Sequence, residues 1–226
     1  MGKPSFSKVV ITEHIIEQTA EFVKETLKNA EGGHDWFHIQ RVFNTAKEIA
    51  KEEDVDILVV SLGALLHDIA DSKFHNGDET VGPKVARQFL EKINVAQNII
   101  DHVVHIIENI SFKGGNEKQK FKSPELDVIQ DADRLDAIGA IGIARCFNYG
   151  GYKNRALYDP EIKPNLHMTK EEYKASTAPT INHFYEKLLL LKDRMNTKTG
   201  KMMAQQRHEF MEDFLTQFYK EWEGKA

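Results

Sequence analysis

The segment Leu65-Leu66-His67-Asp68-Ile69-Ala70-Asp71 places an adjacent histidine and aspartate at the end of an apolar run. Apolar side chains recur at helical spacing from Leu58 to Ile69, which predicts a core helix over about residues 55–70. A carboxylate in such a position is unfavourable without a partner. A divalent cation would satisfy both side chains, and the negative end of the helix dipole would help to hold it.

A second acidic segment repeats this anomaly further along the chain. Asp131, Asp133 and Asp136 place three carboxylates within six residues of an otherwise apolar helix. Carboxylates that converge in a core repel one another unless a cation or an arginine lies between them. Arg134 supplies part of that neutralisation, and we interpret Arg134 and Asp136 as partners in structural ion pairs. Asp131 fits either a site or a structural role.

Two histidines lie upstream of the apolar run. His34 and His38 are four residues apart, so they share one face of a helix. Either could point at the same site as the adjacent His-Asp pair. His34 also precedes Asp35 at the start of the helix, so it fits a site residue and a helix-start cap equally well.

Helical spacing of apolar residues recurs along almost the whole chain, and no stretch shows the alternation typical of a strand. The 14 Gly and 6 Pro leave little material for a turn-rich all-β fold. The sequence therefore predicts one all-α domain over residues 1–226 with about eight helices. The expected helices cover about residues 9–27, 35–53, 55–70, 80–92, 96–110, 124–149 and 169–195, and a last helix ends near Trp222.

The region after the predicted helix 124–149 holds the clearest local signals. Residues 150–168 are expected to form a long loop, and such a loop in a compact domain is more often functional than accidental. Thr169 and Glu172 match a capping box at the start of the next helix. Pro179 should kink or break that helix.

Composition excludes several classes of protein. A single cysteine, Cys146, permits neither an internal disulfide nor a four-cysteine zinc module. The net charge of −5 argues against binding to a nucleic-acid polymer through phosphate contacts. No stretch approaches the roughly 18 apolar residues of a membrane span, and no apolar leader segment is present. We therefore expect a soluble cytoplasmic protein without a membrane partner.

Three motifs in this order resemble the HD-domain metal-dependent phosphohydrolases. They are His-x-x-Arg-Val at 38–42, Leu-Leu-His-Asp at 65–68 and Ala-Asp-Arg-Leu at 132–135. That superfamily is all-helical, and its members mostly hydrolyse phosphate esters or phosphoanhydrides of nucleotides. Carried over by motif, the resemblance implies four metal ligands: His38, His67, Asp68 and Asp133.

Two imidazoles and two carboxylates suit Mn²⁺, which we expect, with Fe²⁺, Co²⁺, Ni²⁺ and Mg²⁺ as alternatives. One departure from the family bears on the substrate. Guanosine-tetraphosphate hydrolases of the superfamily follow the His-Asp pair with x-x-Glu-Asp, whereas this chain has Asp71-Ser72. The missing second acid argues against that substrate.

The resemblance covers about residues 20–150 through its motifs, followed by a helical extension over about 169–222. Segments 182–189, 195–197 and 207–211 resemble a bacterial subgroup of predicted HD-domain hydrolases. This resemblance implies a nucleotide substrate, a nucleoside or deoxynucleoside triphosphate cleaved to monophosphate and pyrophosphate. Two alternatives stay open: a phosphomonoesterase acting on a mononucleotide, and a non-catalytic module that binds metal and nucleotide.

Catalytic and substrate-binding candidates follow from these motifs. Asp71, one helical turn from His67, is the candidate for positioning or deprotonating a nucleophilic water, with His34 as a second catalytic candidate. The apolar stripe of the last helix, over 210–222, is expected in the core or in a homodimer interface. Candidates for substrate binding are Lys73, His105, Lys113, Arg155 and His183.

Overall fold

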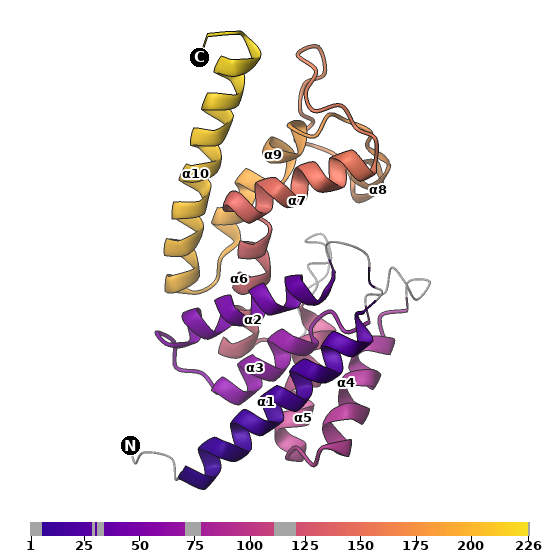
Figure 1. Ribbon diagram of the computed structural model, residues 1–226, viewed down its shortest axis with the longest axis vertical. Helices are drawn as coiled ribbons and strands as arrows, with labels where there is room; N and C mark the ends of the chain where they lie inside the picture. The colour runs from indigo at the N-terminus through magenta and orange to yellow at the C-terminus, as the bar shows by residue number, and fades with distance from the viewer. Residues whose placement is uncertain (1–5, 29, 31–33, 71–77, 111–120, 226) are drawn as a thin grey trace. The chain divides into compact units, whose positions relative to one another are not determined.

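The computed structural model describes residues 6–28, 30, 34–70, 78–110 and 121–225 (Figure 1). This part of the chain contains ten α-helices and one 3-10 helix, and no strand, which confirms the all-α prediction. The helices are α1 (Phe6–Thr26), α2 (Trp36–Ala50), α3 (Ile57–Leu66), α4 (Val81–Lys92), α5 (Gln97–Asn109), α6 (Pro124–Asp136), α7 (Gly139–Tyr152), α8 (Lys170–Ala175), α9 (Asn182–Glu186), η2 (Leu188–Arg194) and α10 (Lys198–Trp222).

Contacts group the chain into two units, residues 1–132 and residues 133–226. The boundary falls inside α6, which continues through it as one helix. The expectation of a single domain stays a prediction. No helix among the described residues is long and apolar enough to span a membrane.

The first unit is built around α3. Every residue from Val59 to Leu66 is buried, and the helix packs against α1, α2 and α5. A helix that is apolar on all sides needs neighbours all round, which is why α3 lies at the centre of this unit. A Cβ atom at Gly63 would lie 2.6 Å from Ile129 Cδ1, so glycine permits α3 and α6 to approach closely at this point.

Both ends of α3 are held by side chains. The Asp56 carboxylate caps its N-terminus, and the Asp56 N–H donates to Glu125 Oε1 at 3.0 Å near the start of α6. The helix ends at Leu66, four residues before the predicted end. His67 Nδ1 binds the Ala64 carbonyl, which would otherwise accept the Asp68 N–H, and the chain continues as a turn.

In the second unit, one expected helix is two. The predicted helix 124–149 breaks between α6 and α7, because Gly139 takes a φ of +73°. Arg207 of α10 covers this break: its Nη1 donates to the Leu135 carbonyl at 2.5 Å, and its stem lies against Gly139. The Leu135 carbonyl, near the end of α6, therefore accepts from Arg207 as well as from the Ile138 N–H at 3.2 Å.

The rest of the second unit follows the local signals closely. The capping box predicted at Thr169 and Glu172 is present at the start of α8, which ends before Pro179. Thr197 caps α10, which begins at Lys198, a few residues after the predicted end of the preceding helix at 195. α7 and α10 pack together (Figure 1), with Phe147 of α7 edge-to-face against Phe214 of α10 at 6.0 Å between ring centroids.

Candidate metal centre

Three of the four predicted metal ligands come together. The ligand atoms of His38 on α2, His67 after α3 and Asp133 on α6 all lie within 4.8 Å of one another. Asp133 directly follows Ala132 on the continuous helix α6, whose Leu126, Val128 and Ile129 are buried in the first unit.

His67 provides the test of whether these residues fit a metal ion. Its Nδ1–H donates to the Ala64 carbonyl at 2.8 Å, which leaves the lone pair on Nε2. Nε2 is buried and has no hydrogen-bond partner among the described residues. A buried polar atom without a partner is unfavourable, and an imidazole oriented through its other nitrogen by a carbonyl is the usual form of a metal ligand. The donor set therefore fits a divalent cation.

His38 is positioned by the first turn of α2. The Asp35 carboxylate caps this helix and accepts the His38 N–H at 2.9 Å, so Asp35, and not His34, is the cap. The His38 side chain is buried, with its ring edge-to-face against His67 at 5.4 Å between centroids. The His34 ring lies 6.0 Å from the His38 ring, measured between centroids.

Asp68, the remaining predicted ligand, is paired with His34. His34 Nδ1 lies 2.5 Å from Asp68 Oδ2. Burial acts to raise the pKa of Asp68, but the hydrogen bond from His34 and the charges of His67, His34 and His38 outweigh it. The pKa of Asp68 therefore lies well below its usual range, so the carboxylate is ionised near neutral pH. Its direct ligation of a metal stays a prediction.

The other charged residues of α6 have different surroundings. Asp136 forms an ion pair with Arg145 at 2.5 Å, and Arg134 donates to the Arg194 carbonyl at 2.8 Å. Asp136 is thus in an ion pair, as the sequence interpretation proposed, whereas Arg134 binds a backbone carbonyl. Asp131 is fully buried.

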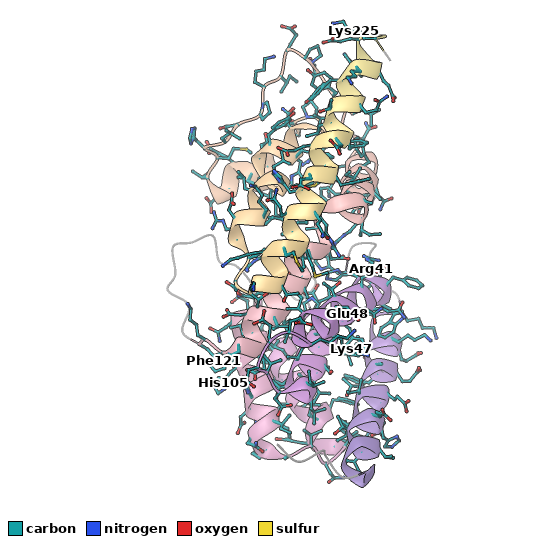
Figure 2. The ribbon with its side chains drawn as sticks, turned by 90° about the vertical axis from the view of Figure 1, so that its left-hand side faces the viewer. Arg41, Lys47, Glu48, His105, Phe121 and Lys225 are labelled. Carbon is teal, nitrogen blue, oxygen red and sulfur yellow. The ribbon has the colours of Figure 1, made fainter. Side chains whose placement is uncertain are left out.

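The predicted catalytic and substrate-binding residues fall into three groups. His105 is exposed on α5, where its ring stacks on Phe121 at 5.3 Å; Figure 2 shows the two side by side. Arg155 and His183 lie in the second unit, close enough for the charge of the first to lower the pKa of the second. Asp71, Lys73 and Lys113 lie outside the described residues.

The second unit also holds features that sequence reasoning missed. Tyr173 and Lys187 lie beside His183, although only the spacing of four residues between His183 and Lys187 hinted at this. A cavity of about 310 Å³ lies elsewhere in the same unit. It is lined mainly by tyrosine and proline side chains, with Tyr158, Tyr185 and Tyr219 among them.

Comparison with known proteins covers nearly the whole chain. An HD-superfamily hydrolase from Bacillus thuringiensis is 43% identical, with 94% of this chain and 98% of that chain covered and a TM-score of 0.77. The uncharacterised protein YpgQ of Bacillus subtilis is 37% identical over 211 residues, which cover 92% of this chain and 94% of YpgQ. A crystal structure of YpgQ in complex with ADP matches with a TM-score of 0.75 and 33% identity, over 93% of this chain and 96% of that chain.

The family match includes the residues of the candidate metal centre. Residues 36–138 match the model of the HD domain, and this range contains His38, His67, Asp68 and Asp133. Three of these side chains meet in the structure as a group able to hold a divalent ion. Together with the similarity to HD-superfamily hydrolases along its length, this shows that the chain belongs to the HD-domain superfamily.

Proposed function

We propose that the protein is a metal-dependent phosphohydrolase that cleaves a phosphoanhydride bond of a nucleotide. The substrate would be a nucleoside or deoxynucleoside triphosphate, converted with water to a monophosphate and pyrophosphate. The observation that carries the proposal is the buried His67 Nε2, which has no hydrogen-bond partner in the described part of the chain and lies beside the donor atoms of His38 and Asp133. A bound cation would give the lone pair of His67 Nε2 a partner.

Each residue of the centre has a proposed role. His38, His67, Asp68 and Asp133 would hold the ion, with Mn²⁺ as the expected metal. A bound divalent ion polarises a phosphoryl group and lowers the pKa of a coordinated water. His34 holds the Asp68 carboxylate in one orientation through its 2.5 Å hydrogen bond. We assign proton abstraction from water to Asp71.

The nucleotide class of the substrate has separate support. YpgQ, which shares 33% of its residues with this chain in the structural comparison, has been crystallised in complex with ADP. A ligand with a diphosphate group in a relative of this similarity favours nucleoside phosphates over simple phosphate esters.

The proposal is tested by incubating the purified protein with Mn²⁺ and a panel of nucleoside and deoxynucleoside phosphates, with products separated by ion chromatography. Release of pyrophosphate from triphosphates is the expected result. Orthophosphate released from monophosphates would instead identify a phosphomonoesterase. Binding of nucleotide without any turnover would identify a non-catalytic module.

A matched pair of variants links activity to the centre. Asp133→Asn removes a charged ligand without changing side-chain size, so we expect turnover to fall on the order of 100-fold or more with the circular dichroism of the helices retained. Asp213→Asn, at an exposed position on α10, is the control and should keep full activity. Unchanged turnover in Asp133→Asn would reject the assigned ligand set.

A further inference from the structure

Three side chains of the second unit lie near the partly buried imidazole of His183. The Tyr173 hydroxyl lies 3.1 Å from His183 Nδ1, and the two rings lie 5.9 Å apart. Lys187 Nζ lies 5.8 Å from the centre of the Tyr173 ring. Arg155 completes the group from the loop after α7. We call Arg155, Tyr173, His183 and Lys187 the basic cluster.

The two cations of the basic cluster are presented differently. Arg155 is partly buried, with Nη2 donating to the Ser176 carbonyl at 2.6 Å and its guanidinium 5.5 Å from the Tyr149 ring centre. A guanidinium has five N–H groups, so this carbonyl uses a fraction of its capacity. Lys187 is exposed at the end of α9. One cation is thus held rigidly, and the other lies at the surface.

The basic cluster places two cations close enough to one imidazole to act on its pKa. Burial, and then the charges of Lys187 and Arg155, lower the pKa of His183 to about 4, so the ring is neutral near pH 7. After burial, the charge of the Glu186 carboxylate also raises the pKa of Tyr173. Oε1 of this carboxylate accepts the Asn165 N–H at 3.1 Å. Two cations that lower the pKa of an imidazole do not attract it. An anion bound among these cations would be stabilised by their charges.

A nucleophilic role for the neighbouring thiol does not explain the cluster. Burial raises the pKa of Cys146 to about 12, although Arg155 and Lys187 act to lower it. A thiol this weakly acidic is neither a nucleophile nor a metal ligand at neutral pH. The positive charges therefore do not serve to activate Cys146.

We propose that the basic cluster is an oxyanion-binding site that takes a phosphoryl group, with Arg155 and Lys187 supplying charge and the hydrogen-bonded pair of His183 and Tyr173 supplying one further hydrogen bond. An arginine with several N–H groups to offer matches phosphoryl oxygens in geometry. The identification of the anion as a phosphate rests on the proposed function. The phosphoryl group can come from the nucleotide substrate or from free pyrophosphate, its product.

Binding measured without metal tests this site separately from catalysis. Isothermal titration in EDTA compares inorganic pyrophosphate with ADP, using the full-length protein. We expect saturable binding of at least one of them that weakens about tenfold or more in Lys187→Gln and in Arg155→Gln, and weakens as salt is raised. Lys201→Gln, at an exposed position on α10, is the charge-matched control and should bind like the unmodified chain.

The outcomes test the oxyanion site separately from the proposed hydrolase activity. Binding of pyrophosphate alone would assign the site to free product, and binding of ADP alone to the nucleotide. Equal affinity in Lys187→Gln, Arg155→Gln and the unmodified protein, or no binding of either anion, would overturn the inference. Asp133→Asn should bind both anions normally in EDTA, so loss of hydrolysis leaves this test intact. Because Lys187 is exposed, its variant keeps the test valid even if Arg155→Gln disturbs folding.

Discussion

Burial shifts the pKa of three side chains of the second unit. The pKa rises where the ionised form is an anion and falls where it is a cation. The pKa of the Cys146 thiol and that of the Tyr173 hydroxyl are both raised to about 12, because burial disfavours an anion. The pKa of His183 falls to about 4, because burial disfavours a cation and two cations lie nearby. The His183 ring is therefore neutral at pH 7, and Cys146 and Tyr173 keep their protons even in mildly alkaline solution.

Cys146 should be almost inert in the folded protein. Its raised pKa leaves a very small thiolate fraction at pH 8, and the thiolate is the reactive form. We expect Ellman's reagent to modify the native protein at least about 100-fold more slowly than the protein in guanidinium chloride. Because this is the single cysteine, the unfolded chain should titrate one thiol. Rapid reaction of the native protein would contradict the buried environment.

His183 should make the folded state less stable in mild acid. Its folded pKa is about 4 against 6.5 for the ordinary side chain, so the unfolded chain binds a proton that the folded chain does not. Stability is fully present above pH 6.5 and falls as pH drops toward 4, by about 2 kcal/mol between pH 7.5 and 5. Urea unfolding at the two pH values measures this, and His183→Gln should lose that part of the change. An identical pH dependence in His183→Gln would refute the assignment.

Sequence reasoning located single residues well where a motif fixed their order along the chain. His38, His67 and Asp133 were predicted together and do meet. The grouping of Tyr173 with His183 was not predicted, because their contact depends on how the chain turns between α8 and α9. Spacing along the chain carries no information about such a contact.

Among the helices, α7 shows how glycine permits contacts that any side chain would block. A Cβ atom at Gly142 would lie 2.3 Å from the Ala137 carbonyl oxygen, which belongs to the backbone at the break before α7. At Gly151 in the last turn, a Cβ atom would meet nothing within 4 Å. Helix α7 therefore contains Gly142, where a side chain would clash, and Gly151, where a side chain would meet nothing.

Alanine at these two positions should have opposite effects. Gly142→Ala forces the backbone apart and should lower the free energy of unfolding by about 2–4 kcal/mol. Gly151→Ala should be neutral or raise it by roughly 0.5 kcal/mol, because alanine is the better helix former. Denaturant unfolding of both variants measures the difference. Equal stabilities would mean that the break before α7 relaxes without cost.

The helices themselves could largely be predicted, but not where all of them stop. Local signals such as the capping box of Thr169 and Glu172 act within a few residues, so the sequence displays them. The break at Gly139 is covered by Arg207, which lies 72 residues from the Leu135 carbonyl that it binds. A contact this distant leaves no trace in the periodicity of 124–149.

For the whole molecule, α6 matters most because it belongs to both units. Its residues Leu126 and Ile129 are buried in the first unit, whereas Arg134 binds the Arg194 carbonyl in the second. Asp133 lies between these two sets of contacts. An ion bound to Asp133 would therefore stabilise the folded state at the helix that joins the units.

Divalent ions should raise the thermal unfolding midpoint of the full-length protein. At a free concentration one hundred times the dissociation constant, binding adds about 2.7 kcal/mol. For a chain of this length that corresponds to a rise of about 5–10 °C, measured by calorimetry in Mn²⁺ against EDTA.

The same experiment on variants assigns the effect to the centre. Asp133→Asn should lose most of the rise, and Asp213→Asn should keep it. A full rise in Asp133→Asn would place the bound ion elsewhere.

The hydrogen bond between His67 and the Ala64 carbonyl also sets the order of events when an ion is acquired. Since a backbone carbonyl orients this imidazole, this ligand is in place before any ion arrives. The chain should therefore reach its helical fold without a bound ion. Loading is then a late and reversible exchange with the surroundings. Several first-row divalent ions suit the same donors, so the ion carried at a given moment should follow the local supply of metals.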